Sequence, residues 1–328
     1  MADKIKKSTD KNYSKIKKIR NNNECLFKDI VIECSNKGKH KTENNHLIQK
    51  ASYLERIAYK NNVMVFDFEN RDYIKNGRQL AKRNIQKANT FHVLCGNHDK
   101  YLFYEIENGN KFDENNQKQL FQFALRAFIF GFSEEELKSN FDNIGTKRVN
   151  EIADIHLSLN KKRLESYKKA VLEETWDIVE TKIIRLKSRV EFISCFAREP
   201  NLGFIFPIKF TNCKISLNIF PEGEDTIILI AYLKEGIGAN AASKFSNKLV
   251  KLSQKNEQRF LKYINKFVIA FDHNIAINPL YWEQLSDGEK KDFYEISQIF
   301  HKCKSFKAGI KGYIKLKYKK SNINLFSD

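Results

Sequence analysis

Apolar residues recur at helical spacing in several stretches of this chain. In residues 113–132 and 158–190 they return every three or four positions with charged residues between them, which is typical of helices that bury one face. Residues 47–60 show the same period in a shorter segment, and residues 100–109 predict another short helix that ends near Gly109. The middle of the chain is therefore predicted to be helical.

Strand-like patterns flank this helical middle. β-branched and aromatic residues predict two N-terminal strands at 29–34 and 63–69. After Pro200 the pattern predicts strands at 202–210, 214–220 and 226–233, with a turn at 221–225. A helix at 241–265 and a strand at 267–271 are predicted next, followed by two short helices within 278–300. Residues 312–320 alternate between apolar and basic residues, which predicts a strand with a basic outer face. We therefore expect an α+β fold.

The pattern divides the chain into four segments. Residues 1–23 are predicted to form a basic flexible arm that ends in three asparagines. Residues 24–112 have short elements and contain a group of cysteines and histidines, which predicts a small module. Residues 113–199 form the helical region, and residues 200–328 form an α+β C-terminal domain. No internal repeat joins these segments.

Positive charge is concentrated at the two ends of the chain. The net charge is +18, of which residues 1–20 contribute +6 and residues 301–328 contribute +7. A basic balance of this size favours a polyanionic partner, most often DNA or RNA, although lysine-rich ends can also serve solubility alone. No apolar run approaches the roughly 18 residues of a membrane span, and the N-terminus lacks the apolar segment of a signal peptide. We therefore expect a cytoplasmic protein with no membrane partner.

Three of the six cysteines lie near histidines and suggest a zinc site. Cys95 and His98 have two residues between them, one of them a glycine, and this spacing lets both donors face one ion. Cys25 and Cys34 are the predicted partner ligands, with His40 as a possible substitute, although eight intervening residues exceed the usual two to four. The alternative is that these cysteines are small core residues.

The same segment contains a second group of polar residues. Asn45-His46 precedes the predicted helix at 47–60, and Leu94-Cys95 is followed by His98, Asp99 and Lys100. This arrangement resembles the HNH (ββα-metal) endonucleases. It also resembles a group of uncharacterised bacterial proteins with a Cys pair, a histidine before a helix, and a CxxHD…F…IE segment, here Cys95, His98, Asp99, Phe103, Ile106 and Glu107. The resemblance covers residues 25–107, about a quarter of the chain.

The resemblance implies a role in phosphodiester cleavage for His46, Asp99 and Asn45. His46 would be the general base that activates water against a phosphodiester. Asp99 with Asn45 would hold a catalytic Mg²⁺ or Mn²⁺, and the zinc would be structural. The chain departs from the family pattern at three positions: His98 replaces a cysteine, Asp99 replaces a histidine, and Asn45 replaces the commoner aspartate.

Two functions remain open at this point. The first is a metal-dependent nuclease or nuclease-derived effector on DNA or RNA, in a setting such as bacterial defence, with the C-terminal domain binding the target or a protein partner. The second is a non-catalytic zinc-containing protein that binds nucleic acid or serves as an adaptor. In that case His46 is a core or helix-capping histidine, and Asp99 caps the helix that begins near Lys100.

Overall fold

The computed structural model describes most of the chain from residue 24 onward. The described residues are 24–28, 30–35, 41–47, 53–66, 79–107, 110–139, 147–199, 212–300 and 306–326. The predicted basic arm at 1–23, His40 and the predicted strand at 202–210 lie outside them. The described helices and strands confirm an α+β fold.

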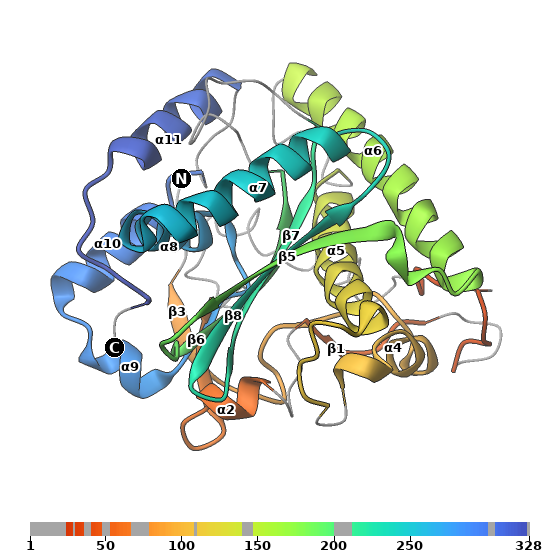
Figure 1. The fold of residues 1–328 in the computed structure, drawn as a ribbon, viewed down its shortest axis with the longest axis horizontal. Coiled ribbons are helices and arrows are strands. Elements are labelled where there is room, and N and C mark those ends of the chain that lie inside the picture. Colours follow the sequence, from red (N-terminus) through yellow and green to blue (C-terminus); the bar gives the residue numbers. More distant parts are fainter. Residues whose placement is uncertain are drawn as a thin grey trace, which may run out of the picture.

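A seven-stranded antiparallel sheet forms the centre of the fold (Figure 1). Its strands, in spatial order, are β3 (Leu80–Asn84), β2 (Asn62–Phe66), β9 (Ala276–Ile277), β6 (Phe192–Arg198), β7 (Ile215–Glu222), β8 (Asp225–Leu233) and β5 (Val179–Leu186). The pairing of β2 with β9 joins segments that are far apart in the sequence. One sheet therefore takes strands from all three predicted segments that follow the arm.

The hairpin of β7 and β8 shows why the sheet is buried on both faces. Gly223 adopts a φ of 62° at the turn, a conformation that glycine reaches without a Cβ penalty. Along β8, alternate residues enter two different apolar clusters, with Leu229 on one face and Ile230 on the other, both fully buried. The strands predicted at 214–220 and 226–233, and the turn between them, are confirmed.

Helices cover both faces of the sheet (Figure 1). One face packs against α7 (Ala239–Lys255), α8 (Glu257–Phe271), α9 (Pro279–Gln284), α10 (Asp287–Ser297) and α11 (Phe306–Tyr318). The other face packs against α5 (Gln117–Ser139), which in turn contacts α6 (Lys147–Leu172), and η3 (Trp176–Ile178) lies beside them. None of the helices in the described part of the chain is long and apolar enough to cross a bilayer.

A small unit with little regular structure packs on the α5 side. We call it the metal module and define it as the described residues of 24–57 and 85–107. It contains the paired strands β1 (Asn45–His46) and β4 (Thr90–Phe91), then α2 (Glu55–Ile57), α4 (Gly96–Leu102) and η2 (Tyr104–Ile106). The helix predicted at 47–60 is described only in part, as α2 and the turn before it, and the one predicted at 100–109 begins earlier, at Gly96.

Three polar side chains on α5 hold this module against the sheet. Gln122 accepts hydrogen bonds from the amides of Glu105 and Ile106 at 2.9 and 3.2 Å, and Arg126 pairs with Glu107. Gln119 donates to the carbonyls of Glu105 and Lys111 and accepts from the amide of Asp113. All three are buried, so backbone groups that would otherwise lose water are satisfied by side chains.

Several sequence predictions are wrong, for identifiable reasons. The helix predicted at 158–190 ends at Leu172, and Val179, Ile183 and Leu186 belong to the strand β5. The strands predicted at 267–271 and 312–320 are helical, in α8 and α11. The helix predicted at 241–265 is two helices, broken at Asn256, whose side chain accepts from the Arg259 amide and caps α8. The described residues of the strand predicted at 29–34 form turns and bends.

Candidate metal centre

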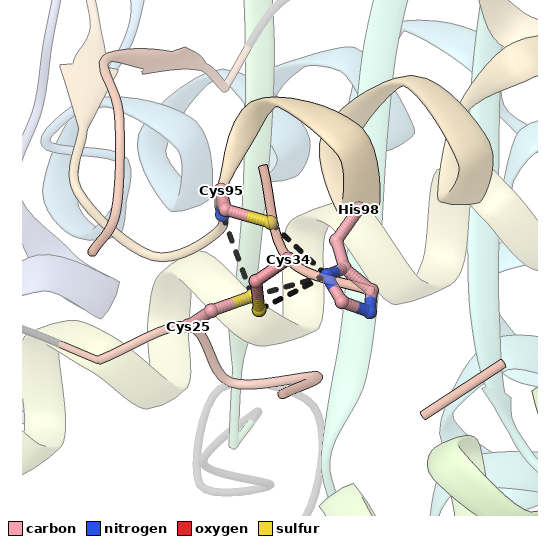
Figure 2. Close-up of side chains that lie close together, drawn as sticks. All are labelled: Cys25, Cys34, Cys95 and His98. Carbon is pink, nitrogen blue, oxygen red and sulfur yellow. Dashed lines mark hydrogen bonds between the residues drawn. The ribbon is translucent and has the colours of Figure 1, made fainter. Parts of the chain in front are cut away.

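The four predicted ligands meet in one buried cluster (Figure 2). The sulfur atoms of Cys25, Cys34 and Cys95 and a ring nitrogen of His98 all lie within 4.8 Å of one another. The Nδ1 atom of His98 is 3.1 Å from the Cys95 sulfur, 3.6 Å from that of Cys25 and 3.7 Å from that of Cys34. Zn–S bonds of about 2.3 Å and Zn–N bonds of about 2.0 Å place tetrahedral ligands roughly 3.4–3.8 Å apart. The cluster has the size and the donors of a zinc site.

Local backbone structure positions each ligand. Cys95 is the last extended residue before α4, and His98 lies in the first turn of that helix. Cys25 is fixed beside it because its sulfur accepts from the Cys95 amide at 3.4 Å, while the Leu26 amide donates to the Val93 carbonyl at 3.0 Å. The described residues between Cys25 and Cys34, 26–28 and 30–33, form turns and bends rather than the predicted strand, and Cys25 and Cys34 still meet in the cluster.

Gly96 lies between the two ligands Cys95 and His98, close to Glu43. A Cβ atom at this position would lie 2.8 Å from an Oε atom of Glu43. The Glu43 carboxylate accepts a hydrogen bond from the Ser35 hydroxyl at 3.1 Å, and the Glu43 amide donates to the Leu94 carbonyl at 2.8 Å. A larger residue would therefore move the end of the Glu43 side chain away from Ser35.

A backbone carbonyl selects the protonation form of His98. Its Nε2 atom lies 2.9 Å from the carbonyl oxygen of Ile30. A carbonyl oxygen can only accept, so Nε2 carries the proton and Nδ1 presents its lone pair to the three sulfurs. A metal-ligating histidine commonly donates its second N–H in this way, which fixes the tautomer and the ring orientation.

The thiols differ in acidity in the metal-free cluster. Burial raises the pKa of Cys25 to about 12 and outweighs the hydrogen bonds it accepts from the Cys95 and Phe27 backbone. Burial also raises the pKa of Cys95, but hydrogen bonds to its sulfur from the backbone of His98 and from Ser35 outweigh it and lower that pKa below its ordinary value. Three cysteine sulfurs and one imidazole nitrogen would fill the four coordination positions of a tetrahedral ion such as zinc and leave none open. Such a site is structural.

The structure places Asn45 and Asp99 side by side, close to this cluster. The Asn45 side chain hydrogen-bonds Asp99, and its Oδ1 atom accepts from the amides of Val93 and Leu94 at 3.2 and 2.8 Å. Burial raises the pKa of Asp99 to about 6, although the positive charge of Arg126 lowers it. The Oδ1 atom of Asp99 is buried and has no hydrogen-bond partner.

His46 lies on the opposite side of strand β1. Adjacent residues of a strand project to opposite faces, and the contacts follow this rule. Asn45 faces the Val93–Leu94 amides, whereas the Nδ1 atom of His46 lies 3.2 Å from the carbonyl oxygen of Ala88. The structure therefore joins two of the three predicted catalytic residues and directs the third away from them.

Sequence reasoning missed the charged and polar residues that α5 contributes. Arg126 is 2% exposed, pairs with Glu107 and lies over the ring of Phe103, with its guanidinium carbon 4.0 Å from the ring centroid. Gln119, Gln122 and Arg126 recur at helical spacing inside an otherwise apolar helix, which was the available signal. The hydrogen-bond partners of Gln119 and Gln122 are backbone groups of residues 105–113, and no pattern of side chains in the sequence indicates such partners.

Comparisons with known proteins do not supply a function. The chain matches no protein-family model, no curated protein and no solved structure. Function is therefore inferred from the geometry of the metal module and from the charge of the surface.

Proposed function

We propose that this chain is a metal-dependent nuclease with an HNH-like module stabilised by structural zinc. The arrangement of β1, β4 and α4, two antiparallel strands followed by a helix that carries metal ligands, supports the resemblance to the ββα-metal endonucleases. The zinc would hold the β1–β4 pair and α4 in register, since all four of its coordination positions are filled by protein atoms.

The observation that carries the proposal is the hydrogen bond of His46. The Ala88 carbonyl accepts, so Nδ1 of His46 carries the proton and Nε2 has the lone pair in the neutral ring. This is the form in which an imidazole acts as a general base toward a water molecule. His46 is also half-buried rather than fully enclosed.

Asp99 would supply an oxygen to a catalytic Mg²⁺ or Mn²⁺, and because it lies on the other side of β1 from His46, the two would act on one phosphate only after β1 rearranged. The unpartnered Oδ1 atom of Asp99 fits this role, because a buried carboxylate oxygen without a donor is free to bind a cation. The Oδ1 atom of Asn45 already accepts two amide hydrogen bonds, so Asn45 positions Asp99 and is not itself a cation ligand.

Cleavage of duplex and single-stranded DNA and RNA in Mg²⁺ and in Mn²⁺ tests the proposal. His46→Ala should reduce the cleavage rate by about 10²–10⁴-fold, the usual contribution of a general base, with zinc content and nucleic-acid affinity unchanged. His156→Gln is the matched control, because His156 is also half-buried but pairs with Glu199 on the far side of α5. Equal cleavage by His46→Ala and wild type would contradict the assigned base.

A second candidate is a non-catalytic zinc protein that binds nucleic acid. The burial of Asn45, at 2% exposure, and the proximity of Asp99 to the Arg126 guanidinium favour this function, because both features leave little room for a cation and a phosphate. It predicts no cleavage by the wild-type protein in either metal, together with binding that weakens steeply as salt is raised.

A further inference from the structure

Helix α7 presents a single-signed row of charge to solvent. Its lysines are Lys244, Lys248, Lys251 and Lys255, at spacings of four, three and four residues, which place them on one side of the helix. The helix contains no aspartate or glutamate. Its opposite side buries Ala242, Phe245, Ser246 and Leu249 against the sheet. We call this row the α7 lysine row.

The row lies on the opposite face of the sheet from the metal module. Helix α7 contacts β5 and β8 on the face that carries α8 and α10, whereas the module packs with α5 on the other face (Figure 1). Beyond Lys255, the exposed residues Arg259 and Lys262 of α8 add positive charge, and Glu257 at the start of α8 adds one negative charge. This surface is therefore physically separate from His46 and Asp99.

Helices α6 and α10 differ from α7 in the sign of their charges, whereas the charged residues of α11 are also all lysines. On α6, Lys168 lies 3.1 Å from Glu165, and Lys169 lies 3.8 Å from Glu173 just beyond the helix end. Helix α10 mixes both signs, and its Asp292 pairs with Lys319 at 3.1 Å. Mixed charges of this kind are sufficient for solubility. A helix whose surface charges are all positive is instead typical of a site that binds a polyanion.

We propose that the α7 lysine row is a docking surface for the phosphate backbone of duplex nucleic acid. At 1.5 Å per residue the row spans about 16 Å, and a duplex carries one charge per ~1.7 Å of its axis, so several phosphates lie within reach. Lysine ammonium groups are point charges on flexible stems, which suits sequence-independent contacts. The apolar side of α7 is used inside the protein, so it cannot insert into a bilayer.

This inference goes beyond the proposed function and does not depend on cleavage. A protein without nuclease activity would still use the row, and a nuclease that binds its substrate only near His46 would not. The two proposals therefore fail separately: the first fails in the His46→Ala cleavage assay, and the second in a binding assay without added Mg²⁺ or Mn²⁺.

The test compares two double variants with equal loss of charge. Lys244→Gln/Lys251→Gln removes two exposed lysines from the row, and Lys161→Gln/Lys169→Gln removes two exposed lysines from α6. Both are made in the zinc-loaded, full-length His46→Ala protein, and the Kd for a 30-base-pair duplex is measured from about 50 to 200 mM salt. A phosphatidylserine vesicle serves as a second polyanionic probe.

The row variant should bind the duplex at least tenfold more weakly at the lowest salt concentration. The slope of log K against log salt should fall by about two, since each lost lysine–phosphate contact removes about 0.9 from it. The α6 variant should keep the wild-type slope. Equal losses in both variants, or no loss in either, would overturn the proposal. It would also be overturned if the row variant lost only vesicle binding, which would assign the row to anionic membranes.

Discussion

The metal module and the central sheet hold their backbones in place by different means. Where the β7–β8 hairpin needs a left-handed residue, the sequence provides Gly223. In the metal module the left-handed positions are Val31, with a φ of 62°, and Asn89, with a φ of 51°. A β-branched residue in this region costs about 1–3 kcal/mol and persists only where its surroundings force it. Lys60 and Asn61 before β2 and Glu174 before η3 are left-handed as well, but Val31 is the one β-branched residue among the described positions of this kind. The module therefore has to be held by something else.

The two regions also differ in what fills their interiors. The sheet buries continuous apolar strands on both faces, and its helices bury apolar sides against them. The module encloses a Cys₃His cluster, an Asn45–Asp99 pair and backbone amides satisfied by α5. This difference shows that the sheet is stabilised mainly by hydrophobic burial, and that the module depends on metal binding and on polar contacts to its neighbour.

Loss of zinc should have the largest effect and should affect only one region. Structural zinc sites contribute on the order of 10 kcal/mol at neutral pH, so Cys95→Ala should lose the metal and unfold the module. Zinc content, measured by elemental analysis, should fall from about one per chain to near zero. Limited proteolysis should then cut within 24–57 and 85–107 and leave 212–300 protected.

Cys213→Ala is the control for this experiment, because Cys213 is equally buried but lies in the apolar cluster on the α7 side of the sheet. It should retain zinc and the wild-type proteolysis pattern. Unfolding of the whole chain in Cys95→Ala would contradict the division between the two regions.

A cavity in the sheet should have the next largest effect, in the opposite region. Ile230 is fully buried on the α7 face, and Ile230→Ala should lower the free energy of unfolding by about 2–5 kcal/mol. Zinc content should remain at the wild-type value. Ile230→Val should cost about 0.5–1.5 kcal/mol, and thermal unfolding measures both. Loss of zinc in Ile230→Ala would show that the metal site depends on the sheet.

Breaking the contact between the regions should have an intermediate effect. Arg126→Met keeps most of the side-chain volume but leaves Glu107 without its partner and removes the cation over the Phe103 ring. The expected cost is about 1–3 kcal/mol, measured by denaturant unfolding. Adding Glu107→Gln should recover part of it, because the double variant removes the unpaired charge. Additive effects of the two substitutions would contradict a direct interaction.

The smallest expected effect is electrostatic and depends on pH. The hydrogen bond from His156 to Glu199, at 2.8 Å, raises the pKa of His156 above its ordinary value of 6.5. The stabilisation is therefore full below pH 6.5 and is lost as the pH rises through the folded-state pKa. His156→Gln should cost less than about 1 kcal/mol at pH 6 and almost nothing at pH 9. A cost that grew with pH would contradict the assignment.

The metal ligands were predictable from the sequence because donor type and spacing are local features. Cys95 and His98 are separated by two residues, and this spacing indicates a knuckle without knowledge of the fold. The roles of Asn45 and His46 were not predictable, because they depend on which face of a two-residue strand each side chain occupies. The amides of Val93 and Leu94 and the carbonyl of Ala88 decide this, and none of them has a sequence signature.

The incorrect secondary-structure predictions also have physical causes. The helix prediction ran past Leu172 because Val179, Ile183 and Leu186 continue the helical spacing by coincidence, and the left-handed residue that ends the segment is Glu174 rather than a glycine. In 312–320 the alternation of Ile314, Leu316 and Tyr318 resembles a strand. In the structure only Leu316 is buried, while Ile314 is 49% and Tyr318 72% exposed on a helix.

The pairing of β2 with β9 has a consequence for the order of events during protein synthesis. All four metal ligands have been synthesised once the ribosome has passed His98, so zinc can bind while the rest of the chain is unmade. The strand β2 must wait for Ala276 and Ile277 before it gains its second neighbour. At about 5–20 residues per second this delay lasts roughly ten seconds or more, during which one edge of the β2–β3 hairpin is exposed. Zinc supply at that stage would determine whether the metal module folds before the sheet is complete.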